Sequence, residues 1–385
     1  MTKKRMKVLF VSSWYSSRVN ETLGNFVQKH AEAVSRYADV SVLYVCFDGA
    51  LTKKKSEIVI NETDKVKTLH IYCKKSSNPL IRFNRYLKAY KKGLKLFIEK
   101  FSEPDLIHVN VVFPVGLLFY FLKSFKKYPF VITEHWAGYL QEYPTKPGFL
   151  KKYLIRKICK CSSAILPVTR DLSEAMQNLG FTGNYKVVPN VVETTVFTLS
   201  PKVKSEVVNI LHVSSLDDDQ KNMTGILNVM NKLSRIRKDF SLHIISDGNQ
   251  QPFIEKAMQL SLNDKFVFFH GAKKTMEVAE MMKRSDFLLL FSNYENLPCV
   301  IVEAYSCGLP VVSTDVGGIS EHLTEKHGLL IKPGDEEALL HTLENMLDHV
   351  HEYDREFLHE YAEKNFSYEN VGKKYFDVYS EIINK

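Results

Sequence analysis

Residues 291–318, which read FSNYENLPCVIVEAYSCGLPVVSTDVGG, give the clearest indication of the fold. The apolar run Phe287–Phe291 predicts a buried strand that ends in the loop carrying Glu295. A helix is predicted to open near Pro298, because proline is favoured in the first turn of helices, and this helix carries Glu303. In open parallel sheets, ligands gather beyond the carboxyl ends of the strands, so this loop is where a binding site is expected.

The two glutamates lie eight residues apart and flank the start of the predicted helix. Helix N-termini present unpaired N–H donors and the positive end of a dipole, which favour an anion. We therefore expect the backbone amides of Asn296, Leu297 and the helix start to face an anion. Glu303 is predicted to accept hydrogen bonds from paired hydroxyls such as those of a ribose, and Glu295 from the hydroxyls of a second sugar.

The alternation of strands and helices extends through the whole chain. Short apolar runs rich in β-branched residues recur between helical stretches, which is typical of parallel sheets built from βαβ units. In the first half the predicted strands are Lys7–Ser12, Val40–Val45, Leu106–Asn110, Phe130–Glu134, Ala164–Val168 and Lys186–Val188. In the second half they are Asn209–Val213, Ser241–Ser246, Phe266–His270, Phe287–Phe291, Val311–Thr314 and Gly328–Ile331. Each half predicts an open doubly wound sheet, with a junction over residues 189–203.

Residues 295–321 resemble the signature of family 4 of the retaining glycosyltransferases. The shared elements are two glutamates separated by seven residues, the run Glu-Ala-x-x-Cys-Gly-x-Pro-Val-Val from Glu303, and Gly-Gly-x-x-Glu ending at Glu321. The resemblance implies an α/β protein of the GT-B fold, in which two Rossmann-like, doubly wound parallel-sheet domains face each other across a cleft. It implies an acceptor-side domain over residues 1–190, a nucleotide-sugar-binding domain over 191–365, and a C-terminal helix over 366–385 that packs back on the first domain.

The resemblance also implies which residues of the second half bind a nucleotide diphosphate sugar. Lys221 matches the family's phosphate-binding lysine, but the arginine of the family's Gly-Arg-Leu is replaced by Ser215. Asp247, in Ser246-Asp247-Gly248, resembles a loop near the nucleotide base. The donor-binding residues predicted in this way are Gly24, Ser215, Lys221, Asp247, Glu295, Asn296, Leu297, Pro298, Val300 and Glu303.

In the first half, His135 follows a predicted strand at the position where the family carries a histidine facing the reacting sugar. Together with Lys221 and Glu295 it is predicted to be catalytic. Its neighbours Glu134, Trp136 and Tyr139 are candidates for acceptor binding. Near the start of the chain, Gly24 resembles the glycine of the family's first loop, where the absence of a side chain lets backbone amides approach a ligand.

The family's chemistry implies transfer with retention of anomeric configuration and no metal or other cofactor. Cationic side chains and helix amides would stabilise the leaving diphosphate in place of a divalent ion. A uridine donor is expected from its frequency in the family, and a glycan or lipid-linked hydroxyl is the expected acceptor. Two alternatives stay open: a nucleotide-sugar epimerase of the same fold, and a catalytically degenerate partner subunit, which the serine at position 215 would suit.

Composition limits the class of protein and its partners. The length of 385 residues favours two domains, and the six cysteines form no C-x-x-C pair, as is typical of reduced cytoplasmic proteins. Residues 1–190 hold 32 Lys and Arg against 14 Asp and Glu, a charge of +18, whereas the remaining residues carry −10. A basic half favours an anionic membrane surface. No nucleic-acid-binding module is recognised, so nucleic acid is not an expected partner.

Part of the positive charge of the first half lies on a predicted basic amphipathic helix over Arg82–Ile98. Its basic residues are Arg82, Arg85, Lys88, Lys91, Lys92 and Lys95. A second basic cluster comprises Lys151, Lys152, Arg156, Lys157 and Lys160. An ordinary domain helix with a solvated lysine face explains the same pattern. The alternative is peripheral docking on the inner face of the membrane.

Overall fold

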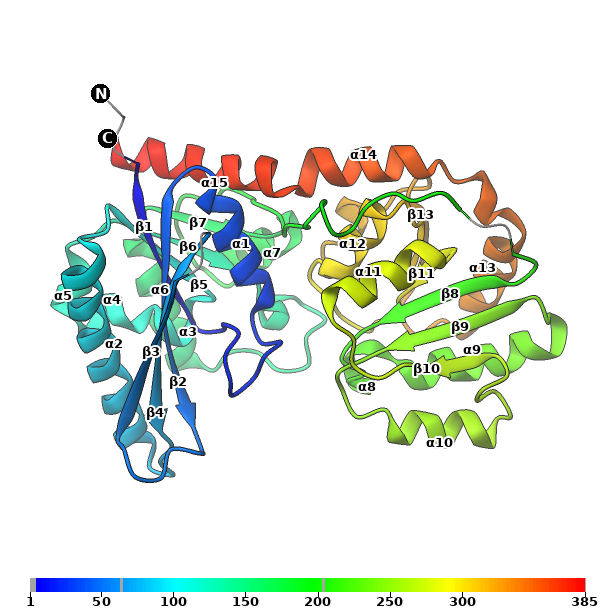
Figure 1. The fold of residues 1–385 in the computed structure, drawn as a ribbon, viewed down its shortest axis with the longest axis horizontal. Helices are drawn as coiled ribbons and strands as arrows, with labels where there is room; N and C mark the ends of the chain where they lie inside the picture. Colours follow the sequence, from blue (N-terminus) through cyan, green and yellow to red (C-terminus); the bar gives the residue numbers. More distant parts are fainter. Residues whose placement is uncertain (1–4, 63–64, 203–204, 385) are drawn as a thin grey trace. The chain divides into compact units, whose positions relative to one another are not determined.

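The computed structural model describes residues 5–62, 65–202 and 205–384 (Figure 1). These residues divide into two compact units, each with its own sheet and core. The first unit takes the described residues up to 139, residues 145–191 and those from 368 onward. The second takes residues 140–144 and 192–367. The predicted junction ends at Val203, which lies outside the described residues.

The first unit is built on a seven-stranded sheet of order β3-β4-β2-β1-β5-β6-β7. Its strands are β1 (Lys7–Ser12), β2 (Asp39–Asp48), β3 (Ser56–Glu62), β4 (Lys67–Lys74), β5 (Leu106–Asn110), β6 (Phe130–Glu134) and β7 (Ala164–Pro167). All neighbours pair in parallel except β3 and β4, which pair antiparallel at one edge. The predicted parallel sheet is confirmed, although the β3–β4 pair was not predicted.

The strand predicted at Lys186–Val188 is wrong, because this segment is irregular. It does run beside β7: Lys186 N–H donates to Ile165 O at 3.0 Å, and Val188 N–H donates to Pro167 O at 3.1 Å. A parallel ladder would also need an N–H from the residue at position 167. Proline has none, so the ladder ends at an isolated bridge between Ile165 and Tyr185.

Helices cover both faces of this sheet. They are α1 (Asn25–Ser35), α2 (Pro79–Phe101), α3 (Val112–Val115), α4 (Leu117–Phe121), α5 (Lys123–Lys126), α6 (Phe149–Cys161), α7 (Arg170–Asn178) and α15 (Tyr368–Ile383), with a 3₁₀ turn η1 (Ala137–Tyr139). α1 and α15 share a core with the middle of the sheet, and a Cβ on Gly372 of α15 would lie 2.3 Å from Ala33 O of α1. On the opposite face, a Cβ on Gly93 of α2 would lie 2.7 Å from a methyl group of Leu43.

The second unit has a six-stranded, wholly parallel sheet of order β10-β9-β8-β11-β12-β13. Its strands are β8 (Val208–Val213), β9 (Phe240–Ile245), β10 (Val267–Phe269), β11 (Phe287–Leu289), β12 (Val311–Thr314) and β13 (Gly328–Ile331). All six correspond to predicted strands, with small shifts at their ends. The run from Leu290 onward leaves the sheet earlier than predicted, so the loop that carries Glu295 is longer.

Two layers of helices enclose this sheet, so it is doubly wound as predicted. The helices are α8 (Asp218–Lys221), α9 (Met223–Ile236), α10 (Gln251–Gln259), α11 (Thr275–Arg284), α12 (Cys299–Ser306), α13 (Glu336–His349) and α14 (Arg355–Phe366), with 3₁₀ turns η2 (Ile319–Glu321) and η3 (Val350–Glu352). α9, α10 and α13 share one core with the sheet, and α11, α12 and α14 share the other. α8 buries no side chain, whereas each of the other α-helices named here buries apolar residues, which is the main source of its stability.

The predicted C-terminal helix over 366–385 corresponds to α15, which begins at Tyr368 because α14 ends at Phe366. Its apolar face is buried in the first unit through Val371, Tyr375 and Tyr379. Over the described ranges of the chain, no helix combines the length and the apolar character that a bilayer crossing requires.

Candidate active site

The strand order of the second unit places two loops next to each other at the carboxyl end of its sheet. From β8 the chain runs outward through β9 to β10, and β11 then returns to the opposite side of β8. Ligands of open α/β sheets bind at such a topological switch point. The loop after β8 leads to Lys221 at the end of α8, and the loop after β11 leads to Glu295. These two side chains, 74 residues apart in sequence, form an ion pair.

Neighbouring side chains hold the Glu295 carboxylate in place. Ser292 Oγ donates to Glu295 Oε1 at 2.9 Å, and Gln220 Nε2 donates to Oε2 at 3.2 Å. The side chains are 7% exposed for Glu295 and 13% exposed for Lys221. An ammonium group carries three N–H donors, so its bond to Glu295 leaves donors that a phosphate group could use. The two predicted residues are therefore in contact, and Lys221 lies in α8 two residues after solvent-exposed Asp219.

The loop after β12 packs directly under Glu295. Gly317 has a φ of +55°, and a Cβ there would lie 2.1 Å from Glu295 O, closer than any side chain allows. Gly318 N–H donates to Asn296 O at 3.0 Å. Thr314 Oγ1 donates to Ser292 O at 2.7 Å. The Gly-Gly element in the sequence therefore has a structural cause: only glycine lets this loop support the backbone beside Glu295.

Helix α12 begins immediately after the loop that carries Glu295, at Cys299, as predicted from Pro298. The side chain of Pro298 has no hydrogen-bonding atom, so it cannot cap the N–H groups of the first turn. Pro298, Cys299 and Val300 are all part-exposed. Glu303 lies in the same helix and is also part-exposed. Asn296 and Leu297, in contrast, are buried at 8% and 3% exposure. In this segment, the backbone N–H groups that an anion could reach are therefore those at the part-exposed start of α12.

A buried histidine that the sequence patterns missed positions the loop after β8. His212 Nδ1 donates to Leu289 O at 2.8 Å, and its Nε2 accepts from Ser214 Oγ at 2.7 Å. Ser214 Oγ in turn accepts from Leu216 N–H at 3.2 Å. Burial is the main reason why the pKa of His212 is lowered to about 4, so the ring is neutral at neutral pH. The ring therefore ties β11 to the turn at Leu216, whose φ of +57° is unusual for a bulky residue.

The loops that carry Ser215 and Asp247 also lie against each other. A Cβ on Gly248 would lie 1.8 Å from Ser215 O, so only glycine permits this approach. Gly248 N–H donates to Ser246 Oγ at 2.9 Å, which closes the turn after β9. Ser215 and Asp247 are exposed. Both predicted loops therefore share the carboxyl end of the sheet with Lys221 and Glu295.

Comparison with known families identifies the class of protein that has this arrangement. Residues 24–196 match the family described as Glycosyltransferase Family 4, and residues 208–349 match the family described as Glycosyl transferases group 1. The chain belongs to the family 4 glycosyltransferases. The family predicted from the glutamate signature is thus confirmed.

Individual relatives and solved structures are similar to this glycosyltransferase in sequence or in fold. TuaC of Bacillus subtilis, provisionally named as a glycosyltransferase of teichuronic acid biosynthesis, is 25% identical over 249 residues, covering 64% of this chain and 62% of TuaC. Sucrose-phosphate synthase from Thermosynechococcus elongatus superposes with a TM-score of 0.80 at 16% identity, covering 99% of this chain and 100% of that chain. Anabaena HepE in complex with UDP and glucose has a TM-score of 0.73 at 16% identity, covering 98% and 100%. The GT-B fold is confirmed.

In the first unit of the glycosyltransferase, Gly24 begins α1 in the left-handed conformation. A Cβ at this position would lie 2.5 Å from the backbone of Trp14, in the loop that follows β1. Glycine is therefore required for the helix start to approach this loop. The ligand-facing role predicted for Gly24 stays a prediction, and the packing gives an independent reason for the residue.

Glu134 and His135 follow one another at the end of β6 and have different surroundings. Glu134 is fully buried, and its carboxylate accepts from the N–H groups of His135 (2.9 Å), Trp136 (3.0 Å) and Val112 (3.0 Å). Burial raises the pKa of Glu134, and these three bonds oppose the rise. The acceptor role predicted for Glu134 stays untested, whereas its contacts show that it fixes the backbone that carries His135.

His135 lies in a buried group of rings. It is 9% exposed, and its ring centroid is 4.3 Å from that of Phe26 and 5.2 Å from that of His30. Burial, with smaller effects from His30 and His108, holds the pKa of His135 well below its ordinary value. A neutral ring can donate one hydrogen bond and accept another, which suits the predicted sugar-orienting role.

The two aromatic candidates for acceptor binding differ in exposure. Trp136 is part-exposed, and Lys151 Nζ lies 3.8 Å from the centre of its ring. Tyr139 is 3% exposed and meets Trp136 edge to face at 4.9 Å. Of the two, Trp136 has the surface that an acceptor could contact, and the roles predicted for both stay predictions.

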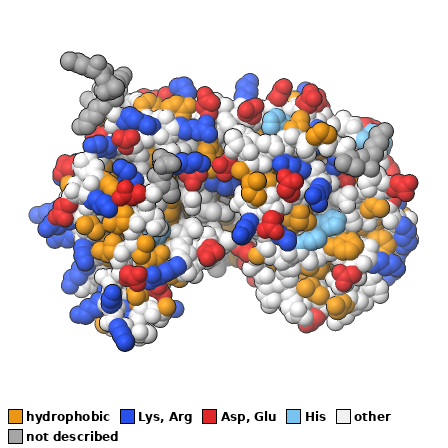
Figure 2. Space-filling view, in the orientation of Figure 1, with side chains coloured by type: hydrophobic (Ala, Val, Ile, Leu, Met, Phe, Trp, Pro, Cys, Tyr) orange, Lys and Arg blue, Asp and Glu red, His pale blue; other side chains and the backbone are white. Residues whose placement is uncertain are grey.

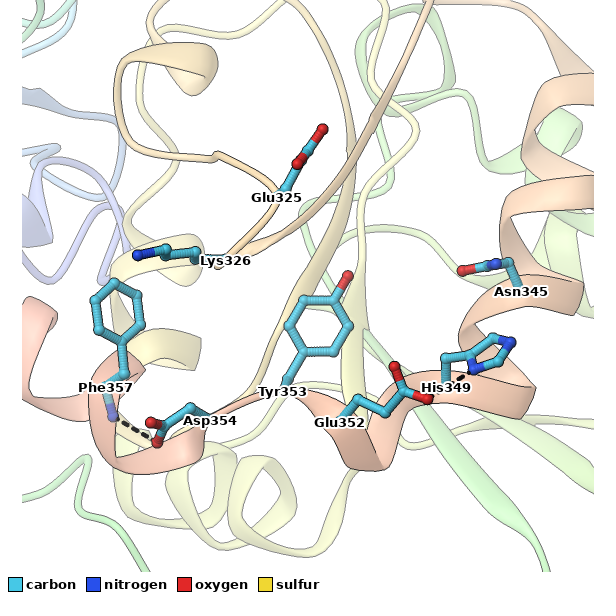
Figure 3. Close-up of a pocket in the computed structure, with 8 residues that line it drawn as sticks. All are labelled: Glu325, Lys326, Asn345, His349, Glu352, Tyr353, Asp354 and Phe357. Atoms are coloured by element: carbon cyan, nitrogen blue, oxygen red, sulfur yellow. Dashed lines mark hydrogen bonds and ion pairs between the residues drawn. The ribbon is translucent and has the colours of Figure 1, made fainter.

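A cavity of about 670 Å³ in the second unit lies away from this site (Figure 3). Its walls come from the segment before β13, with Glu325 and Lys326, and from the turn between α13 and α14, with His349 and Tyr353. Parallel strands share one direction, so the segment before β13 belongs to the amino edge of the sheet. Glu295 follows the carboxyl end of β11, at the opposite edge.

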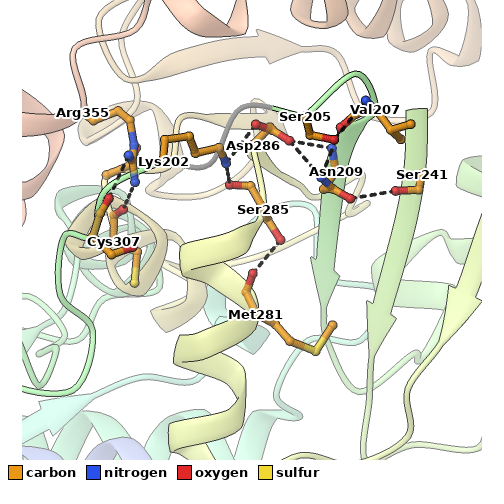
Figure 4. A network of polar contacts seen from close by, with 12 residues as sticks. Lys202, Ser205, Val207, Asn209, Ser241, Met281, Ser285, Asp286, Cys307 and Arg355 are labelled. Atoms are coloured by element: carbon orange, nitrogen blue, oxygen red, sulfur yellow. Dashed lines mark hydrogen bonds and ion pairs between the residues drawn. The ribbon is translucent and has the colours of Figure 1, made fainter. Parts of the chain in front are cut away.

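The amino edge of the second sheet carries a polar network that is structural (Figure 4). Asp286 accepts from the backbone N–H of Asn209 at 2.6 Å and pairs with Lys202 at 2.9 Å. Arg355 donates to Cys307 O at 3.2 Å and Gly308 O at 3.3 Å, at the end of α12. The Cys-Gly element of the family signature is thus held by α14. No cluster of three or more potential metal ligands occurs among the described residues.

Proposed function

We propose that this glycosyltransferase moves a hexose, with retention of anomeric configuration, from a UDP-sugar to a hydroxyl of a glycan or lipid-linked acceptor. The product would belong to a cell-surface polysaccharide or glycolipid. The observation that carries the proposal is the Lys221–Glu295 pair, which the sheet order places at the switch point beside the start of α12.

Each part of this arrangement has a task in sugar transfer from a nucleotide diphosphate. Lys221 and the part-exposed amides of α12 would stabilise the charge that develops on the leaving diphosphate. Glu303 would accept hydrogen bonds from the ribose hydroxyls, and Glu295 from the hydroxyls of the sugar. In the first unit, neutral His135 would orient the sugar, held by the backbone that Glu134 fixes. No step in this scheme requires a metal ion.

The comparisons support the choice of donor and product class. HepE, whose fold this chain shares, was solved in complex with UDP and glucose. TuaC is provisionally named for teichuronic acid biosynthesis. A uridine donor and a cell-surface polysaccharide are therefore the first donor and product to test.

Donor binding is tested by titrating the protein with UDP, UDP-hexoses and other nucleotide sugars, with calorimetry and thermal stabilisation as the readouts. We expect UDP compounds to bind more tightly than their GDP and ADP counterparts. Glu303→Ala should weaken binding roughly 10-fold to 150-fold, the range for a lost hydrogen bond to a charged group. Glu280→Ala, which removes an exposed carboxylate paired with Lys283, is the matched control. Unchanged affinity in Glu303→Ala would contradict the ribose role.

The reaction itself separates the proposal from its alternatives. Incubation with a UDP-hexose and no acceptor should leave the configuration of the sugar unchanged, whereas an epimerase would convert it. With an acceptor, the anomeric coupling constant of the product in NMR should match that of the donor. A protein that binds no nucleotide diphosphate would be a degenerate partner subunit, and the proposal would fail.

A further inference from the structure

A lysine-lined groove on the first unit lies outside the candidate active site. Its volume is about 470 Å³, and it lies between α2 and the segment of α5. Five lysines line it: Lys88, Lys91, Lys92, Lys95 and Lys127. Leu94 and Ile98 provide apolar surface beneath them. Figure 2 shows basic side chains gathered along the edge of the first unit at which Figure 1 places α2 and α5.

Most of this positive charge is not neutralised by the protein. Lys95 and Lys127 lie 3.7 Å and 2.6 Å from Glu99 and Glu103. Lys88, Lys91 and Lys92 are exposed and pair with no carboxylate in the described part of the chain. Like charges this close repel one another, so the groove favours an extended anionic surface.

Exposed apolar side chains lie on α2 itself and on α4, whose rings contact each other. Leu80 and Ile81, in the first turn of α2, are 79% and 45% exposed, and Tyr120 and Phe121, at the end of α4, are 44% and 47% exposed. The two helices meet there, since the ring of Phe83 contacts that of Phe121 at 5.4 Å. Ile81, Lys88 and Lys95 are spaced by seven residues, so they share one face of α2. Exposed apolar side chains beside a basic face are typical of helices that lie in a membrane interface.

We propose that the groove and these exposed apolar side chains, carried by α2, α4 and α5, dock the protein on an anionic lipid bilayer. The lysines contact lipid phosphates, and Leu80, Ile81, Tyr120 and Phe121 enter the headgroup region. The inference rests on the proposed function in one respect, that an enzyme acting on a lipid-linked acceptor works at the bilayer surface. Docking itself needs neither nucleotide nor acceptor.

Vesicle sedimentation tests the docking surface with the full chain and no nucleotide. Wild type should bind vesicles of 30% phosphatidylglycerol and 70% phosphatidylcholine more tightly than pure phosphatidylcholine. One basic side chain near such a surface strengthens binding by about fivefold, so the triple variant Lys88→Gln, Lys91→Gln, Lys92→Gln should bind roughly 100-fold more weakly. The matched control Lys265→Gln, Lys326→Gln, Lys364→Gln removes the same charge from exposed sites of the second unit and should bind as wild type does.

A second variant separates apolar insertion from charge. Leu80→Ser with Ile81→Ser should weaken vesicle binding by a factor that stays constant between 50 and 300 mM salt, whereas the effect of the lysine variant should shrink with salt. Equal binding by wild type and the lysine variant would overturn the proposal, as would binding to duplex DNA without binding to vesicles. UDP affinity, measured without lipid, should be the same in all variants. If the wild-type protein does not bind UDP, the proposed function is refuted, whatever the result with vesicles.

Discussion

Replacing Lys221 with methionine should destabilise the second unit and reveal how strongly the ion pair at the switch point is coupled. The side chains of Lys221 and Glu295 are 13% and 7% exposed, so the pair is nearly buried. Removing one partner of a buried pair costs about 3–5 kcal/mol. Ser292 and Gln220 still donate to the Glu295 carboxylate in this variant, so we expect the lower end, about 3 kcal/mol. For a unit of this size, that lowers the melting temperature by roughly 6–12 °C.

The double variant Lys221→Met, Glu295→Gln shows whether the loss of stability comes from the interaction between the two side chains. Glu295→Gln alone should cost about 1.5 kcal/mol, because the freed Lys221 can turn towards solvent while the amide still accepts from Ser292. With both changes, no unpaired charge stays buried, and the loss should be about 2 kcal/mol rather than the sum of the two. The coupling energy is then about 2–3 kcal/mol, at the upper end for residues in contact. Donor binding should stay impaired in the double variant, since the cation is missing.

Urea unfolding followed by far-UV circular dichroism measures these differences. Both tryptophans, Trp14 and Trp136, lie in the first unit, so tryptophan fluorescence reports on that unit and serves as the internal reference. The exposed pair of Lys232 and Glu337 is a matched control, and the same cycle there should give a coupling below about 1 kcal/mol. Additive losses for Lys221 and Glu295 would refute the reasoning, because they would mean that the pair is not coupled.

Three further predictions concern two glycines at close backbone contacts and one buried histidine. Gly248→Ala places a Cβ 1.8 Å from Ser215 O and should weaken UDP binding at least tenfold in calorimetry, whereas Gly148→Ala, where a Cβ meets nothing within 4 Å, should not. Gly372→Ala forces α15 away from α1 and should lower the stability of the first unit by about 1–3 kcal/mol, read by tryptophan fluorescence; an unchanged midpoint would contradict the packing. The pKa of buried His212 is lowered to about 4 in the fold, against 6.5 in the unfolded chain, so its contribution is complete above pH 6.5 and is lost as pH falls towards 4. His212→Gln should therefore lose roughly 2 kcal/mol less stability than wild type between pH 7.5 and 5, and parallel pH profiles would exclude this role.

The strands that the sequence predicts best are those buried on both faces. β1, β5, β6 and β12 are short, mostly apolar runs of buried residues whose ends agree with the prediction. The β3–β4 pair is different: β3 lies at the edge of the sheet, has no buried residue, and reads SEIVINE with polar residues at both ends. Such an exposed strand has a continuous apolar run of only three residues, Ile58 to Ile60, and its pairing depends on a partner that the local pattern does not identify.

In the candidate site, the sequence predicts which residues take part but not which of them are in contact. Glu295 and Lys221 were predicted from their flanking sequence, but nothing in either segment indicates that they touch. Their contact depends on the order of the strands, which brings β11 back beside β8. Contacts over such sequence separations come from the topology of the whole sheet and are absent from any local pattern.

The residues that position the site were missed for a physical reason. His212 lies in an ordinary apolar strand, and its importance comes from two partners, Leu289 O and Ser214 Oγ, that the fold supplies. Glu134 illustrates the converse, because a carboxylate at a strand end suggests ligand binding by its residue type. In the fold, three backbone amides surround it, which offsets the cost of burying its charge. A buried carboxylate held by amides has few acceptor sites left for a ligand, so we propose that Glu134 positions the backbone of His135 and does not contact the acceptor. On this argument, Glu134→Gln should lower the turnover number more than it raises the Michaelis constant for the acceptor, because it disturbs the orientation of His135 rather than a contact with the acceptor.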